Sequence, residues 1–368
     1  MIILNLKLRN FRNYENLDIS FGKGMNVITG KNAQGKTNLL ESMIYLSLTR
    51  SHRISDDKRL IKEGESYAHI RCDYEDEYKR QIEAVIYPKG KTLLVRKQPV
   101  KRSSEFIGLL NVILFAPDDL RMFIDPPKER RRVMNQEITK VSPRYLLSLN
   151  QYQNLLKNRN LLLKSNQVDL NLLDTLDEQM AKEEVLIIKS RNLFVKSLQE
   201  VIPTLYQKIS DTNISLQLKY KCCLDEVSEN EQDLYESLLK MHQDSRKKDL
   251  EYKVTSVGIH HEDLEFMMDD QKLVFVASQG QKRMAMLAFK LSLLAYIKKE
   301  TGKKPILLLD DVLSELDEHR QKKLLDMVNG PYQCFITATE VPEYLKYKNI
   351  QIYEVDHGSI ELIQGGKE

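Results

Sequence analysis

Glycine is missing from the middle of this chain, from Leu109 through Val257, although the chain contains 14 glycines. Proline is also missing, from Arg144 to Ile202. Because these two residue types mark turns, their absence predicts long helices in the middle of the chain. The two flanking segments hold all of the glycine and are expected to form turn-rich α/β structure.

Other absences exclude several classes of protein. No apolar run approaches the roughly 20 residues that span a bilayer, and the first residues indicate a strand, not a secretory signal. The four cysteines, Cys72, Cys222, Cys223 and Cys334, show no CxxC spacing, which disfavours a zinc or disulfide framework. We therefore expect a cytoplasmic protein without a membrane partner. The net charge is only +3, so a nucleic-acid surface must come from local basic clusters.

Apolar residues in the middle of the chain recur at intervals of three and four. The two clearest sets are Leu149, Tyr152, Leu156 and Leu163, and Leu173, Leu176, Met180 and Ile187. This spacing predicts amphipathic helices that pack as a hairpin. The period leaves open whether they form a short coiled coil or a compact bundle.

The flanks contain short, almost wholly apolar segments that end in polar loops, at 25–29, 305–309 and 334–339. Such segments are typical of a parallel sheet with function at the strand ends. Alternating apolar and polar residues from His69 to Val100 favour an antiparallel sheet beside it. We expect an α/β head, lobe I, built from residues 1–120 and 255–368, with an inserted helical lobe II at 121–254.

One loop matches the phosphate-binding pattern G-x-x-x-x-G-K-[ST] at every fixed position, and it stands between an expected strand and an expected helix. Its glycines let backbone N–H groups surround phosphate oxygens. Lys36 would neutralise the β- and γ-phosphates, and the Thr37 hydroxyl would bind Mg²⁺. The expected ATP-binding residues are Gly30, Lys31, Asn32, Ala33, Gln34, Gly35, Lys36, Thr37 and Asn38.

The apolar run at 307–309 ends in Asp310 and Asp311, which is a Walker B pattern. Asp310 would hold Mg²⁺, and Asp311 would orient or deprotonate the attacking water, with Lys36 as the second catalytic residue. An apolar strand that ends in acids is common by itself. Together with a P-loop upstream, it specifies a nucleotide-hydrolysing site.

Two further segments resemble ABC-type ATPases. The signature motif matches Ser278, Gln279, Gly280 and Gln281 at the start of an expected helix, and Ser314 and Asp317 match a D-loop directly after Walker B. A simple helix cap is the alternative for Ser278. In that class the signature of one subunit covers the γ-phosphate held by the other, so the resemblance implies an ATP-dependent, head-to-tail homodimer.

The interval between Thr37 and Ser278 is too short to contain the coiled coils of long SMC proteins. It is longer than the ATPase subunits of transporters need. The signature residues and five further segments resemble the bacterial RecF family over nearly the whole chain. These segments are 6–14, 30–38, 115–120, 127–132 and 310–317. That resemblance implies ATP-dependent binding to double-stranded DNA and ss/dsDNA junctions near gaps, recombinase loading, RecR- and RecO-like partners, and nucleoid association. The alternative is an ABC-type head in another DNA-maintenance or defence complex.

Two positions differ from ordinary ABC patterns. Asp311 stands where most have Glu, and Thr337 or Thr339 stands near the usual switch His. We expect slow hydrolysis. The DNA-binding candidates are Arg130, Arg131 and Arg132, and the alternatives for them are a solvated helix face, a nucleotide contact or a contact with the opposite subunit. Arg12 and Tyr14 are candidates for adenine or ribose contacts, with an ordinary buried tyrosine as the alternative.

Overall fold

A six-stranded, mainly parallel sheet carries the strands that the sequence predicted. Its order is β15-β14-β3-β13-β12-β8, and β15 alone runs antiparallel to its neighbour. The strands are β3 (Met25–Thr29), β8 (Val112–Phe115), β12 (Ile306–Leu309), β13 (Cys334–Thr337), β14 (Gln351–Asp356) and β15 (Ser359–Gln364). Since β3, β12 and β13 are parallel, their carboxyl ends meet at one edge of the sheet.

A second six-stranded sheet is antiparallel, with the order β2-β1-β4-β5-β6-β7. Its strands are β1 (Ile2–Phe11), β2 (Tyr14–Ser20), β4 (Ala68–Glu75), β5 (Lys79–Tyr87), β6 (Gly90–Val95) and β7 (Gln98–Pro99). The alternating segment from His69 to Val100 does form this sheet, as expected. The N-terminal strands β1 and β2 complete it.

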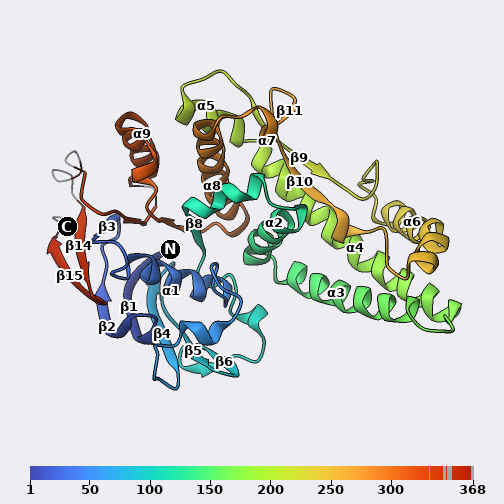
Figure 1. Ribbon diagram of the computed structural model, residues 1–368, viewed down its shortest axis with the longest axis horizontal. Coiled ribbons are helices and arrows are strands. Elements are labelled where there is room, and N and C mark those ends of the chain that lie inside the picture. The colour runs from blue at the N-terminus through green and yellow to red at the C-terminus, as the bar shows by residue number, and fades with distance from the viewer. Residues whose placement is uncertain (331, 343–344, 346–349, 366–368) are drawn as a thin grey trace. The chain divides into compact units, whose positions relative to one another are not determined.

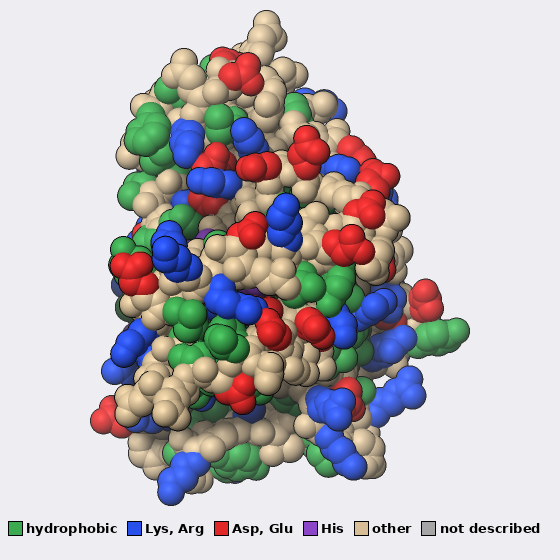
Figure 2. Space-filling view, turned by 90° about the vertical axis from the view of Figure 1, so that its right-hand side faces the viewer, with side chains coloured by type: hydrophobic (Ala, Val, Ile, Leu, Met, Phe, Trp, Pro, Cys, Tyr) green, Lys and Arg blue, Asp and Glu red, His purple; other side chains and the backbone are tan. Residues whose placement is uncertain are grey.

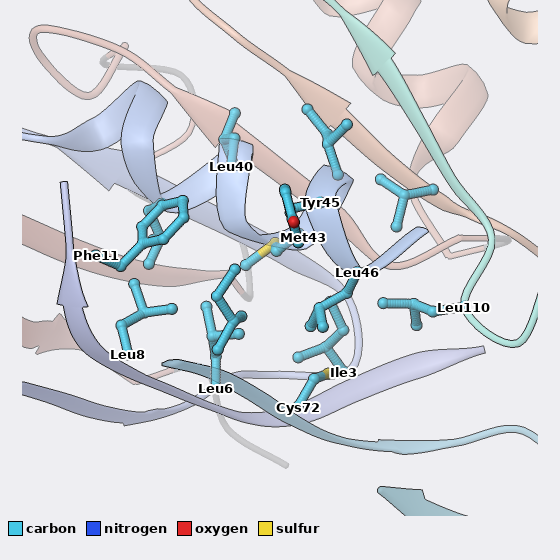
Figure 3. Packing of buried hydrophobic residues seen from close by; sticks show 14 of the residues in the cluster. Ile3, Leu6, Leu8, Phe11, Leu40, Met43, Tyr45, Leu46, Cys72 and Leu110 are labelled. Atoms are coloured by element: carbon cyan, nitrogen blue, oxygen red, sulfur yellow. The ribbon is translucent and has the colours of Figure 1, made fainter. Parts of the chain in front are cut away.

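Helix α1 (Lys36–Leu48) contacts both sheets, with β4 and β5 on one side and β8 and β13 on the other. Figure 3 shows its residues Leu40, Met43 and Leu46 packed against side chains of β1. Nine of its residues, from Leu39 to Ser47, are buried. A helix apolar on several sides is stable only inside a core, and this packing fixes the position of the loop that precedes it.

The structure is a computed structural model that describes residues 1–330, 332–342, 345 and 350–365, and it divides into two compact units (Figure 1). Unit 1 comprises Met1–Leu120, Thr204–Thr212 and Arg283–Glu368, and unit 2 comprises Arg121–Pro203 and Asn213–Lys282. The expected boundaries of lobes I and II, at residues 120 and 254, stay predictions about domains. The segments left undescribed fall within the expected lobe I.

Unit 2 contains the helices expected in the middle of the chain and a small sheet that was not expected. Its helices are α2 (Pro127–Val141), α3 (Pro143–Leu163), α4 (Leu170–Gln199), α6 (Glu231–Tyr252) and α7 (Leu273–Val276). Its strands, in the order β11-β10-β9, are β9 (Leu216–Lys221), β10 (Asp263–Met268) and β11 (Gln271–Lys272). α4 packs against α3 and α6, and the predicted apolar sets face these contacts, apart from the half-buried Leu156.

The remaining elements complete the two units. Helix α5 (Ile202–Ser210) and helix α8 (Gln279–Thr301) each begin in unit 2 and end in unit 1, and α9 (Glu318–Val328) lies in unit 1. The 3₁₀ turns are η1 (Asp57–Leu60), η2 (Ser103–Glu105), η3 (Pro117–Phe123), η4 (Ile259–His261) and η5 (Leu313–Glu315). In the part of the chain that the structure describes, no helix has the length and apolarity needed to cross a membrane.

Candidate nucleotide site

The P-loop links β3 to α1 and bends in a way that only glycine tolerates at two positions. Gly30 has a φ of 138°, and a Cβ there would lie 2.3 Å from the carbonyl oxygen of Val355. Gly35 has a φ of 122°, and its Cβ would lie 2.5 Å from Nδ2 of Asn13. Ala33 also has a left-handed φ, of 65°. The two glycines of the motif are therefore required by close approach and by backbone conformation.

The start of α1 fits a phosphate group. No side chain caps the helix, and its first turn contains no acidic residue. The free N–H groups and the helix dipole therefore leave a site for an anion. Lys36 turns back into the loop, where its Nζ donates to the carbonyl of Gly30 and, at 2.9 Å, to that of Lys31. Burial lowers the pKa of Lys36, and the charges of Asp311 and Asp310 oppose that shift.

Asp310 lies at the end of β12 and accepts two hydroxyl hydrogen bonds. Thr37 Oγ1 donates to its Oδ1 at 3.0 Å, and Thr337 Oγ1 donates to the same atom at 2.7 Å. Its side chain is buried, and burial raises its pKa in spite of these two hydrogen bonds. An alcohol and a carboxylate in contact at a phosphate-binding loop are hard oxygen ligands of the kind that Mg²⁺ takes.

Asp311 differs from Asp310 in both conformation and exposure. Its φ is 52°, in the left-handed region, and its N–H donates to Thr337 Oγ1 at 2.9 Å. Its side chain is exposed, whereas Asp310 is 7% exposed. Thr337 thus contacts both aspartates, and Thr339 is exposed beyond the end of β13. The neighbouring acids are held apart, one facing Thr37 and one facing solvent.

The turn between β1 and β2 makes hydrogen bonds to the P-loop. Asn13 Nδ2 donates to the carbonyl of Gln34 at 2.7 Å, and Asn38 Nδ2 donates to Asn13 Oδ1 at 2.8 Å. Tyr14 is fully buried and its hydroxyl donates to the carbonyl of Gly35 at 3.0 Å. A direct contact of Tyr14 with adenine or ribose is therefore excluded by its burial, and its role is to hold the loop.

The Arg12 side chain is likewise engaged within the protein. Its Nε and Nη2 donate to the two carboxylate oxygens of Glu41 at 2.9 and 3.0 Å, and Nη1 donates to the carbonyl of Arg59. Glu41 is fully buried on α1, and it also accepts from Ser51 at 2.5 Å. Arg12 thus neutralises a buried acid, which explains its position better than a nucleotide contact.

The β14–β15 hairpin covers the P-loop from another side, which sequence reasoning missed. His357 N donates to Gln34 Oε1 at 2.7 Å. A Cβ on Gly358 would lie 2.5 Å from the carbonyl oxygen of Asn13. His357 and Gly358 both have a positive φ, as a two-residue hairpin turn needs. The His-Gly dipeptide was the one sequence signal for this turn.

The signature residues lie at the start of α8, where Ser278 forms a helix cap. Its Oγ accepts from Gln281 N at 3.2 Å, and Gln281 Oε1 accepts from Ser278 N at 2.8 Å, which is a reciprocal capping box. Ser278, Gln279 and Gly280 are exposed, and nothing lies within 4 Å of a Cβ built on Gly280. The cap and an exposed helix N-terminus therefore coexist, so the two interpretations of Ser278 do not exclude one another.

The D-loop residues have contacts within unit 1. Ser314 Oγ donates to the carbonyl of Asp311 at 2.8 Å, which ties this segment to Walker B. Asp317 caps α9 by accepting from Arg320 N at 3.0 Å. The structure thus brings together the P-loop, Walker B and D-loop residues in one unit.

The arginine triplet is divided by its contacts in unit 2. Arg130 donates to both carboxylate oxygens of Asp263, at 2.8 and 2.9 Å, and to two backbone carbonyls. Arg131 donates to the carbonyl of Glu262. Both side chains are structural, which argues against the DNA contacts considered for them. Arg132 is more exposed, with an ion pair to Glu129 on the same helix.

Comparisons with known proteins agree on one family. The AAA domain family matches residues 5–325. The DNA replication and repair protein RecF of Lachnoclostridium phytofermentans is 40% identical over 98% of this chain and 99% of its own. The protein of the same name from Limosilactobacillus reuteri is 38% identical over 98% of each chain.

Solved structures give the same result. A structure of the recombination mediator protein RecF-ATP in the RecFOR pathway superimposes with a TM-score of 0.91 at 33% identity, covering 99% of this chain and 98% of that one. An SMC head bound to the C-winged helix domain of ScpA has a TM-score of 0.57 at 17% identity, over 100% and 98% of the two chains, and shows the shared fold alone. The expected fold, an ABC/SMC-like ATPase head with parallel and antiparallel sheets, is confirmed.

Proposed function

The chain belongs to the RecF family of DNA replication and repair proteins and carries an ATPase domain of the AAA class, and from this premise we propose that it is an ATP-controlled DNA-binding switch in recombinational repair and replication restart. The observation that carries the proposal is the contact of Thr37 and Thr337 with Asp310 beside an uncapped helix start. It joins the P-loop and Walker B motifs in one place, as nucleotide hydrolysis requires.

ATP binding is expected to rearrange Lys36 first. Its ammonium would exchange the carbonyls of Gly30 and Lys31 for oxygens of the β- and γ-phosphates, while the N–H groups at the start of α1 surround the phosphate. Thr37 and Asp310 would hold Mg²⁺, which supplies charge neutralisation between these phosphates when bound. Asp310 would then exchange hydroxyl donors for a cation that favours its ionised form.

Hydrolysis would depend on Asp311, whose side chain is exposed beside this site. We propose that it orients the attacking water, with its backbone held by Thr337 and Ser314. Its arm is one methylene shorter than that of Glu, so the base reaches less far toward the γ-phosphate. Slow turnover of ATP follows. It suits a protein that stays on DNA as the ATP-bound dimer and is reset by hydrolysis.

ATP is proposed to drive head-to-tail pairing through the signature. Ser278 and Gly280 are exposed at the start of a helix of 23 residues, and no residue of the same unit covers them. Phe275, three positions earlier, is 82% exposed, and Val276 is 44% exposed. Apolar side chains beside an open helix N-terminus support contact with a second copy that brings a bound γ-phosphate.

DNA binding is proposed to use exposed basic side chains. Lys89, Lys97, Lys101 and Arg102 are exposed around β6 and β7, and Arg132, from the triplet that the sequence singled out, is exposed in unit 2. On the face shown in Figure 2, basic and acidic side chains alternate, so that face presents mixed charge. We propose double-stranded DNA and gap junctions as ligands and RecR- and RecO-like mediators as partners, with recombinase loading as the outcome.

The test is DNA binding with and without ATP and Mg²⁺, on duplex, single-stranded and gapped DNA, across a series of salt concentrations. We expect tighter duplex binding with ATP, weakening steeply with salt as phosphate contacts are screened. Lys36→Ala should abolish nucleotide binding and the ATP effect, whereas the exposed Lys23→Ala should behave as wild type. Binding that is indifferent to nucleotide would refute the switch.

A further inference from the structure

Two consecutive cysteines, Cys222 and Cys223, lie beside a buried carboxylate in unit 2. Asp263 of β10 pairs with Lys221 of β9, so Glu262, just before β10, lies opposite Cys222 and Cys223, just after β9. One ligand atom from each of these three residues lies within 4.8 Å of the others. The antiparallel pairing of the two strand ends therefore creates the cluster.

The two oxygens of Glu262 have different surroundings. Oε2 accepts from Arg191 Nη1 at 2.5 Å and from the Tyr220 hydroxyl. The Arg191 guanidinium therefore balances the carboxylate charge at this oxygen. Oε1 accepts from Cys222 Sγ at 3.3 Å and from Cys223 N at 3.2 Å. Glu262 is 1% exposed, and its orientation is fixed by these contacts. It presents one oxygen to the two cysteines.

We propose that Cys222, Cys223 and Glu262 form a binding site for one thiophilic divalent cation of the Zn²⁺ type. Each thiol loses its proton to the solvent and forms a metal–sulfur bond. The bond from Glu262 Oε1 to the ion replaces the hydrogen bond that Cys222 now donates. Zn²⁺ takes sulfur and oxygen ligands in tetrahedral geometry, and water supplies the fourth ligand because both cysteines are half-buried.

The local charges balance with the ion in place. Two thiolates and one carboxylate face a divalent cation and the Arg191 guanidinium, so the net charge of the cluster is zero.

The bound ion would join the end of β9 to the start of β10 and, through Arg191, to α4. This is a local clamp in unit 2, and it is independent of the ATPase proposal. The CxxC criterion, which disfavoured zinc, could not detect it, because one of the ligands lies 39 or 40 positions away from the cysteines. Cys72 and Cys334 are buried elsewhere, in unit 1, and serve as controls.

The test uses the full chain, reduced with a phosphine and freed of metal by a chelator. Zn²⁺ is titrated in by calorimetry, and Co²⁺ is used to record the near-ultraviolet thiolate-to-metal charge-transfer absorption. We expect one equivalent to bind with the cobalt thiolate signature. Cys222→Ser and Cys223→Ser should each weaken Zn²⁺ binding at least tenfold, the double variant should lose it, and Cys334→Ser should match wild type.

Three results would overturn the site. They are wild-type protein that binds less than one equivalent at a large excess of Zn²⁺, cobalt binding without the thiolate absorption, or a double variant that binds as wild type does. The wild-type spectrum decides the question even if a variant misfolds. Circular dichroism of each variant checks folding. Glu262→Gln is avoided as the main test, because it would also break the Arg191 ion pair.

Discussion

Asp310 illustrates a residue placed for ligand binding at a cost to stability. Burial raises its pKa, so at a pH above that pKa the charged side chain costs the folded protein free energy that the unfolded chain does not lose. For an acid with a raised folded pKa, this penalty is complete at neutral pH and disappears as the pH falls through the folded pKa. The Thr37 and Thr337 hydroxyls reduce the penalty without removing it.

Asp310→Asn should therefore stabilise the protein without nucleotide while removing Mg²⁺-dependent ATP binding. At neutral pH we expect the melting temperature to rise by about 2 °C, because an amide oxygen still accepts from both hydroxyls. The difference should shrink as the pH is lowered toward 4. Differential scanning calorimetry across this range is the measurement. A lower melting temperature at pH 7 would show that the ionised carboxylate is not destabilising.

At the residue scale, sequence patterns predicted those residues whose chemistry depends on near neighbours. Gly30 to Thr37 and Asp310 were found because a phosphate loop and a strand end are local features. Tyr14 and Arg130 could not be assigned, because their partners, Gly35 and Asp263, are brought near only by the fold. A basic triplet looks the same in sequence whether it faces DNA or a buried acid.

At the scale of elements, the β14–β15 hairpin is predicted to control the P-loop without touching nucleotide. Gly358→Ala would place a Cβ 2.5 Å from the carbonyl oxygen of Asn13, and Asn13 would lose its contacts with Gln34 and Asn38. We expect ATP affinity to fall at least tenfold. Gly302→Ala is the matched control, since its φ is also positive, at 71°, but its Cβ would meet nothing within 4 Å.

Both variants carry the strain of alanine in a left-handed conformation, about 1–2 kcal/mol. The difference between them therefore isolates the contact with Asn13. Equilibrium binding of a fluorescent ATP analogue provides the comparison. Equal affinities for the two variants would refute this role of the hairpin.

The helices of unit 2 are joined by a buried ionic cluster. Arg159 on α3 donates to Asp177 on α4 and to Asp249 on α6, both at 2.7 Å, and all three side chains are fully buried. Such a cluster links three helices whose apolar faces alone would allow several registers.

Arg159→Met should destabilise the protein by about 3–5 kcal/mol, because it leaves the buried Asp249 carboxylate without its cation, whereas Asp177 keeps its ion pair with Arg246. Lys157→Met, two positions earlier on the exposed side of α3, should change stability by less than about 0.5 kcal/mol. Urea unfolding followed by circular dichroism gives both values. A similar cost for the two variants would contradict the role of the cluster.

Elements were predictable where a period or a turn signal was strong. The three parallel strands and the long helices α3 and α4 followed from apolar runs and from the absence of glycine. The sheet of unit 2 did not, because β9 is short and its partner β10 lies beyond the whole of α6. A pairing between segments that far apart leaves no local pattern.

At the scale of the whole molecule, the motifs proposed for the ATPase belong to different units. The P-loop and Walker B residues belong to unit 1, whereas Ser278 to Gln281 belong to unit 2, on the helix that continues into unit 1. The signature can act on a γ-phosphate only by meeting a bound nucleotide. We propose that this nucleotide belongs to a second copy of the chain.

Solution mass measured by light scattering tests this claim most directly. The protomer has a mass of 43.0 kDa, and we predict about twice that value with ATP and Mg²⁺, and the protomer mass with ADP. Ser278→Arg should still bind ATP, because Ser278 is not part of the P-loop, but should remain at the protomer mass. An unchanged mass at saturating ATP, or a dimer formed by Ser278→Arg as readily as by wild type, would contradict the shared site.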